Sequence, residues 1–176
     1  MHLMPRPSYQ AVLDDLGLLD ELTDYQPMVI GTPPLGIDIG SSDIDVACTA
    51  DDLEQFVSDM TKRFGNQAGF TVAALSEFAD PAVRIAFTTS DWEVELFCQA
   101  IPIAEQWGVR HFLIERRLLA VQPALRNKVI ELKKSDFKTE PAFARLLGLE
   151  GDPYEAMLKL EALSDDELAA LVAQPM

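Results

Sequence analysis

Two aspartates separated by one apolar residue are the most chemically distinctive feature of the sequence. Asp43 and Asp45 flank Ile44 and are followed by Val46. Because side chains alternate between the faces of a β-strand, both carboxylates are expected on one face, with Ile44 and Val46 in the core. Neighbouring carboxylates in a low-dielectric site repel each other unless a cation lies between them. Oxygen ligands of this kind favour Mg²⁺ (or Mn²⁺), whose coordination is usually completed by water and substrate phosphates.

A glycine-rich loop precedes the acidic segment. Residues 31–42 contain three glycines, two prolines and two adjacent serines, and they follow the short apolar run 28–30, which reads as a buried strand. Glycines allow backbone N–H groups to approach a phosphate closely. The order strand, glycine loop, acidic strand therefore indicates a site where a metal ion and nucleotide phosphates meet.

These residues resemble the signature of the nucleotidyltransferase superfamily, which includes polymerase beta and the kanamycin-type enzymes. In that signature, an apolar residue, Gly, and Gly or Ser are separated by a loop from Asp-apolar-Asp/Glu-apolar. Here Ile30-Gly31-Thr32 is separated by ten residues from the segment 43–46. More closely, the chain resembles a bacterial family of domains of unknown function within that superfamily, over roughly residues 1–160.

The resemblance implies a third carboxylate on a neighbouring strand. Residues 92–97 match the family's strand of the form Glu-x-Glu-apolar-Phe. Glu95 is the first candidate because apolar residues flank it, and Glu93 shares its face as the reserve, although a solvated position is equally expected for Glu93. Asp43, Asp45 and Glu95 are thus the expected metal ligands, and the same three with Glu93 are the expected catalytic residues.

The resemblance also implies a set of residues that contact the nucleotide. In the loop these are Gly31, Thr32 and Ser42. Leu35, however, stands where many members of the superfamily place a triphosphate-binding arginine. The two prolines at 33 and 34 also lack backbone N–H donors. The loop alone is therefore expected to bind a triphosphate weakly, and positive charge must come from elsewhere.

A basic stretch later in the chain is the expected source of that charge. Nine of the 14 Lys and Arg residues lie between Arg110 and Arg145. Arg110 and Arg117 are seven residues apart and share a helix face, so either is expected to contact phosphate. His111, with Glu115 four residues on to orient its ring, is expected to contact substrate or to shuttle a proton. The alternative is a partly buried histidine beside a salt-bridged helix. Most of the nine are expected on solvated helix faces.

The composition limits the class of partner and the location. With 14 Lys+Arg and 29 Asp+Glu, the formal net charge is −15, which disfavours a long nucleic acid as substrate. The chain has no apolar run near the roughly 18 residues that span a bilayer, and its N-terminus does not read as a signal peptide. A cytoplasmic protein that does not bind membranes is expected. Cys48 and Cys98 end apolar runs and are expected to be buried thiols.

The remaining pattern predicts an α+β fold. A first helix capped by Ser8 and interrupted at Gly17 precedes the strands. Further strands are expected over 70–75, 83–88 and 92–98, with a helix over about 51–64 before them and a hairpin at 89–91. From Ala104 the pattern is helical. We therefore expect a nucleotidyltransferase-type mixed sheet with flanking helices in residues 1–102, and a helical part in 103–176 that packs on it as one compact unit.

Two hypotheses of function follow. In the first, the protein moves a nucleoside monophosphate from a nucleoside triphosphate to a hydroxyl of a small molecule or a protein, with Mg²⁺ as cofactor. In the second, the same fold is a non-catalytic module that senses a nucleotide or binds a partner, as in toxin–antitoxin pairs; the missing loop arginine favours this hypothesis and the intact acid pair opposes it. Hydrolysis of a nucleotide at the same site is a weaker third possibility.

Overall fold

The computed structural model describes residues 6–173, and the chain divides into two compact units. The first, the sheet unit, comprises the described residues through Gly31 together with Ser42–Gln106. The second, the helical unit, comprises Thr32–Ser41 and the described residues from Trp107 onward. The helices of the C-terminal half thus share a unit with the loop that precedes the acidic strand.

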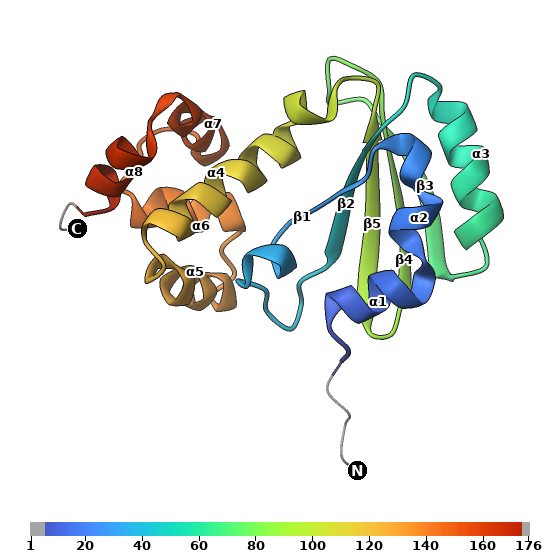
Figure 1. Ribbon diagram of the computed structural model, residues 1–176, viewed down its shortest axis with the longest axis horizontal. Helices are drawn as coiled ribbons and strands as arrows, with labels where there is room; N and C mark the ends of the chain where they lie inside the picture. Colours follow the sequence, from blue (N-terminus) through green and yellow to red (C-terminus); the bar gives the residue numbers. More distant parts are fainter. Residues whose placement is uncertain (1–5, 174–176) are drawn as a thin grey trace, which may run out of the picture. The chain divides into compact units, whose positions relative to one another are not determined.

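A five-stranded mixed sheet forms the centre of the sheet unit (Figure 1). Its spatial order is β1-β2-β5-β4-β3, and only β2 and β5 pair in parallel. The α+β class and the mixed sheet predicted from the sequence are therefore confirmed. The strands are β1 (Met28–Ile30), β2 (Ile44–Thr49), β3 (Ala68–Leu75), β4 (Ala82–Thr89) and β5 (Trp92–Gln99).

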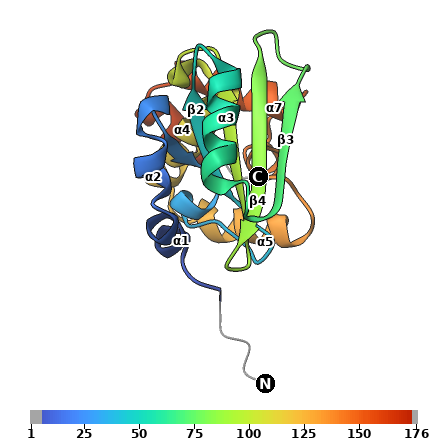
Figure 2. The same cartoon turned by 90° about the vertical axis from the view of Figure 1, so that its right-hand side faces the viewer.

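Three helices cover one face of this sheet: α1 (Tyr9–Leu16), α2 (Leu18–Glu21) and α3 (Leu53–Phe64) (Figures 1 and 2). The Ser8 hydroxyl accepts a hydrogen bond from the Ala11 amide, and Gly17, at φ 58°, separates α1 from α2 as the sequence predicts. Apolar residues of β2 and β5, such as Ile44 and Val94, are fully buried against these helices. The opposite face of the same strands carries the acidic side chains.

A two-residue turn joins β4 to β5 and fixes their register. Ser90 and Asp91 both have positive φ, 49° and 61°, as a type I′ hairpin requires. Thr89 consequently pairs with Trp92, and Glu95 lies beside Ala86 of β4. Two short 3-10 helices complete the sheet unit, η1 (Thr23–Tyr25) and η3 (Ile103–Glu105).

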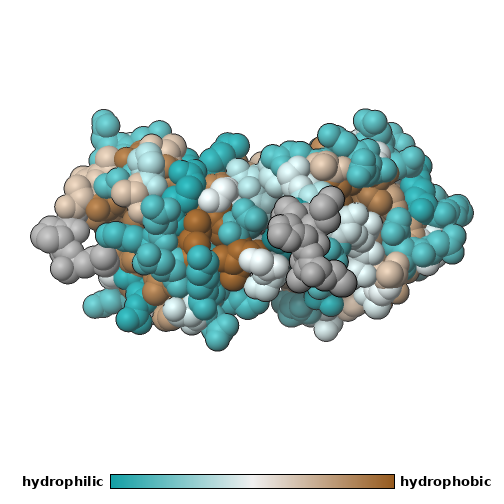
Figure 3. All heavy atoms as spheres, turned by 90° about the horizontal axis from the view of Figure 1, so that it is seen from below, coloured by the Kyte–Doolittle hydropathy of each residue, from teal (hydrophilic) through white to brown (hydrophobic). Residues whose placement is uncertain are grey.

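The helical unit begins with η2 (Pro33–Leu35) in the loop and continues in the C-terminal half of the chain. Its other elements are α4 (Trp107–Val121), α5 (Leu125–Lys134), α6 (Thr139–Leu146), α7 (Pro153–Leu158), η4 (Lys159–Ala162) and α8 (Asp165–Val172). Ser164 and Glu167 form the predicted capping box of α8. Within residues 6–173, no helix is both long and apolar enough to cross a membrane. Hydrophilic residues cover most of the face drawn in Figure 3.

Candidate active site

The acidic residues predicted as the site come together on the sheet face that α1 to α3 leave uncovered. In the parallel pair of β2 and β5, Asp45 lies directly opposite Glu95. Asp43 lies one residue before β2 begins, and Glu93 precedes Glu95 on the same face of β5. Glu95 is partly buried, whereas Glu93 is exposed. Of the two glutamates, Glu95 is thus the one placed beside Asp45.

The charges on this face act on one another. Burial raises the pKa of the Glu95 carboxyl, the Arg84 guanidinium opposes that rise, and the Asp43 and Glu93 carboxylates add to it. Arg84, on β4, places its Nη1 3.5 Å from Glu95 Oε2. A partly buried carboxyl with a raised pKa beside other acids favours binding of a divalent cation or acceptance of a proton.

Gly31 approaches the acid pair so closely that no side chain fits there. It follows β1, in which Ile30 pairs with Asp45. Its φ is 77°, and a Cβ added to it would lie 2.3 Å from Asp45 Oδ2. Both facts require glycine at this position. The glycine of the motif therefore shapes the surroundings of the Asp45 carboxylate directly.

The residues on the acidic face fit a hard divalent cation. Carboxylate oxygens from adjacent strands, on a face that the helices of the sheet unit leave open, suit an ion that keeps water and phosphate ligands. Among the residues described, no group of three or more His, Cys, Asp or Glu side chains is arranged to hold a metal ion by itself. Coordination of Mg²⁺ by Asp43, Asp45 and Glu95, completed by water and a bound substrate, therefore stays a prediction.

The loop between the motif's glycine and Ser42 is held by basic residues of α5. Arg126 donates from Nε and Nη2 to the Leu35 carbonyl oxygen at 3.2 and 3.1 Å, and Lys133 Nζ donates to the Ile37 carbonyl at 3.0 Å. Within the loop, the Thr32 carbonyl accepts from the amides of residues 35 and 37. These two α5 cations thus order the loop backbone.

Two basic residues of α4, Arg110 and Arg117, have acidic or carbonyl partners inside the helical unit. Arg110 forms a bidentate ion pair with Glu161, with Nε–Oε1 and Nη2–Oε2 distances of 2.9 and 2.5 Å, which raises the pKa of Arg110 and lowers that of Glu161. Arg117 donates to Asp165 Oδ1 at 2.9 Å and to the Leu163 carbonyl.

His111 is buried rather than presented on a surface. The residue is only 4% exposed, and its Nε2–H donates to the Tyr154 carbonyl oxygen at 2.9 Å. The rings of Trp107 and Tyr154 meet it edge-on. These contacts account for the ring orientation without Glu115, which the sequence predicted as its partner. The proposed contact of Arg110, His111 and Arg117 with a nucleotide stays a prediction.

Two buried titratable side chains in the helical unit were not predicted from the sequence. Lys133 belongs to the basic stretch, most of which was expected on solvated faces, but it is only 8% exposed. Glu115 is 3% exposed; burial raises its pKa well above the usual range, Glu140 adds to the rise, and Lys133 opposes it. A lysine and a glutamate at helical spacing look the same in sequence whether solvated or buried. Most other basic residues of α4 to α6, such as Arg116 and Lys134, are exposed as predicted.

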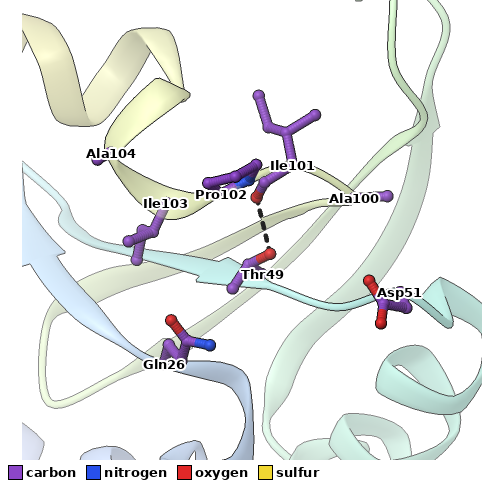
Figure 4. A pocket seen from close by; sticks show the side chains of 8 residues that line it. All are labelled: Gln26, Thr49, Asp51, Ala100, Ile101, Pro102, Ile103 and Ala104. Atoms are coloured by element: carbon purple, nitrogen blue, oxygen red, sulfur yellow. Dashed lines mark hydrogen bonds between the residues drawn. The ribbon is translucent and has the colours of Figure 1, made fainter.

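A pocket of about 380 Å³ lies at the other end of β2 (Figure 4). Thr49 and Asp51 line it together with residues 100–104, and Thr49 Oγ1 donates to the Ile101 carbonyl at 2.7 Å. No predicted site residue lines this pocket. It is therefore separate from the acidic face.

Comparison with known proteins identifies both a family and a fold. The family described as a domain of unknown function, DUF4269, matches residues 11–160. Among solved structures, the chain is similar to a chain of the GLD-2/RNP-8 complex (TM-score 0.57, 14% identity, 95% of this chain and 63% of that one). It is also similar to Cid1 poly(U) polymerase with MgGTP bound (TM-score 0.56, 14% identity, 80% of this chain and 47% of that one).

These matches cover only part of the similar chains, at low sequence identity. The chain spans about half of the Cid1 chain and less than two thirds of the GLD-2/RNP-8 chain. At such low identity, the likeness shows the nucleotidyltransferase fold predicted from the motif, and the fold alone. No curated protein matches the sequence.

Proposed function

The chain belongs to the DUF4269 family, and we propose that it transfers a nucleoside monophosphate from a nucleoside triphosphate to a hydroxyl group, with release of pyrophosphate. One observation carries the proposal: Asp45 and Glu95 lie opposite each other on β2 and β5, with Asp43 close enough to raise the pKa of Glu95. Bound Mg²⁺ would neutralise phosphate charge and polarise the phosphorus that is attacked. Asp43, Asp45 and Glu95 would hold that ion.

The chain's own residues suggest how the transfer proceeds. The acceptor oxygen forms a bond to the α-phosphorus, and the bond from that phosphorus to the pyrophosphate oxygen breaks. The proton of the attacking hydroxyl passes to a carboxylate, for which Glu95 is suited because burial raises its pKa. Gly31 and Ser42 at the edges of the loop, with Thr32 beside them, would contact the phosphates. Catalysis would consist mainly of positioning and charge neutralisation.

The acceptor in this proposal is a hydroxyl on a small molecule or a protein rather than a long RNA. Cid1 is a poly(U) polymerase, but similarity of fold does not show that two proteins share a substrate. A net charge of −15 repels a polyanion and leaves little affinity from counterion release. A cytoplasmic location and the absence of membrane binding are part of the same proposal.

Pyrophosphate release with each of the four ribonucleoside triphosphates, with and without Mg²⁺, tests the function. We expect release that requires Mg²⁺ and is lost in Asp45→Asn, and that is stimulated more by hydroxyl-bearing small molecules or proteins than by RNA. No release under any of these conditions, from a chain that binds nucleotide, would reject the transferase.

A non-catalytic nucleotide-sensing or partner-binding module, of the toxin–antitoxin kind, is the second candidate. The observation that favours it is the engagement of basic side chains: Arg126 and Lys133 bond loop carbonyls, and Arg110 is paired with Glu161. Leu35 adds no charge to the loop. Nucleotide binding that does not depend on Mg²⁺, without pyrophosphate release, would support this candidate.

A further inference from the structure

An arginine near the start of the described chain contacts the first residue of β5 and the segment that leads into β2. The Arg6 guanidinium carbon lies 3.4 Å from the centroid of the Trp92 ring, and Arg6 Nη1 donates to the Ser42 carbonyl oxygen at 3.0 Å. Trp92 in turn donates from Nε1 to the Pro7 carbonyl at 2.9 Å. Arg6 and Pro7, which we term the N-terminal strap, thus join the residue before Asp43 to the first residue of β5. All of these residues belong to the sheet unit.

The position of these contacts matters because Asp43 lies outside the strand ladder. The pairing of β2 with β5 begins at Ile44 and Val94, so the peptide unit that joins Ser42 to Asp43 lies before the paired part of the strand. The Ser42 carbonyl belongs to that unit, and a peptide unit is planar. A hydrogen bond that holds this oxygen therefore also fixes the direction in which the chain enters Asp43.

The strap itself is well anchored. Trp92 is 3% exposed and belongs to the hydrophobic core of the sheet unit, so its ring is a rigid platform. A guanidinium stacked on an indole is attracted to the ring face and still presents its N–H groups in the ring plane. The strap thus gives the Ser42 carbonyl a charged donor whose own position is fixed by the core.

We propose that Arg6 is a positioning residue of the acid site: through the Ser42 carbonyl it holds the Asp43 carboxylate on the face that Asp45 and Glu95 share. The assignment rests on the proposed function for its consequence, metal binding. The ordering of the Ser42–Asp43 peptide by Arg6 does not depend on that function. Arg6 touches neither substrate nor metal in this role.

Two measurements on the full chain test the assignment. Amide hydrogen exchange at Asp43 and Ile44 reports local order without metal, and titration with Mn²⁺ alone, followed by electron paramagnetic resonance, reports the site. Arg6→Met should speed exchange at these two amides about tenfold and weaken Mn²⁺ binding about tenfold, the scale expected when a charged hydrogen bond is lost. Arg6→Lys should fall between Arg6→Met and the native chain, because an ammonium donates but lacks the planar face.

Arg63→Met is the matched control, since Arg63 also donates to a backbone carbonyl, that of Glu21, within the same unit. It should change neither measurement. Unchanged exchange at Asp43 and Ile44 in Arg6→Met, or an equal change in Arg63→Met, would overturn the positioning role. If the native chain binds no Mn²⁺, the metal site of the proposed function is rejected, and the exchange rates alone decide the role of Arg6.

Discussion

Asp45 of β2 lies directly opposite Glu95 of β5, in the one parallel pairing of the sheet. Because successive side chains alternate, a slip of one residue in β5 would turn Glu95 into the core and Val94 onto the acidic face. The tight turn at Ser90 and Asp91 sets the register of β5 against β4. The meeting of the two acids thus depends on a hairpin turn as well as on the acidic motif itself.

Asp45→Asn should abolish Mg²⁺-dependent pyrophosphate release, with a loss of about 100-fold or more, because an oxyanion ligand of the metal is removed from the transition state. Asp43→Asn should behave in the same way. Steady-state assays with a saturating triphosphate measure the loss. Glu131→Gln, which neutralises an exposed acid on α5, should leave the rate unchanged; a comparable loss in this variant would indicate an effect of net charge.

Gly31→Ala should destabilise the protein strongly, because it combines a positive φ with a clash against Asp45 Oδ2 at 2.3 Å. We expect a loss of roughly 3 kcal/mol or more in the free energy of unfolding, measured by urea denaturation. Gly17→Ala has a positive φ of 58° and open space around the new methyl group, so it should lose only about 1–2 kcal/mol. Gly40→Ala, with neither problem, should change little. Equal losses of unfolding free energy at positions 31 and 17 would show that the Asp45 carboxylate moves aside without an energetic cost.

The strands and the acidic face were predictable from the sequence because both follow from a period of two. Asp43, Asp45, Glu93 and Glu95 alternate with apolar residues, and that alternation alone separates a polar face from a core. The helix caps at Ser8 and Ser164 were likewise readable, since capping is local chemistry.

The long-range polar contacts were not predictable by the same reasoning. Lys133 donates to the Ile37 carbonyl and Arg6 donates to the Ser42 carbonyl. Because every residue has a backbone carbonyl, the sequence does not show which one accepts a long-range hydrogen bond. The burial of Glu115 is similar, because helical spacing shows a face but not what packs on it. Such contacts depend on tertiary packing, which sequence periodicity does not encode.

Glu115→Gln should increase stability at neutral and alkaline pH. Burial and Glu140 raise the pKa of Glu115 in the folded protein, against the opposing effect of Lys133. The folded state therefore holds a proton that the unfolded chain releases above about pH 4.3. Stability should fall as the pH rises through this window, by up to about 1.4 kcal/mol per pH unit. The variant should lack that slope.

Urea denaturation of the native chain and Glu115→Gln at pH 5, 6, 7 and 8 measures the slope. The free energies of unfolding should diverge progressively as the pH rises, with the variant the more stable at pH 8. Glu131→Gln, an exposed acid, should follow the native curve. Parallel curves for the native chain and Glu115→Gln would mean that Glu115 is ionised throughout, compensated by Lys133.

Arg110→Ala should weaken nucleotide binding by about 1–3 kcal/mol, the range for a hydrogen bond to a charged group, if Arg110 contacts phosphate as predicted. Because Arg110 is paired with Glu161 at 2.9 and 2.5 Å, loss of this pair alone must be distinguished from loss of a phosphate contact. Glu161→Gln breaks the ion pair but keeps the guanidinium, so it should leave affinity unchanged or raise it. Lys134→Ala, at an exposed position, should do almost nothing.

Calorimetric titration with a triphosphate in Mg²⁺ measures all three. Equal losses in Arg110→Ala and Glu161→Gln would assign Arg110 to structure, and equal losses in Arg110→Ala and Lys134→Ala would indicate a diffuse field rather than a specific contact.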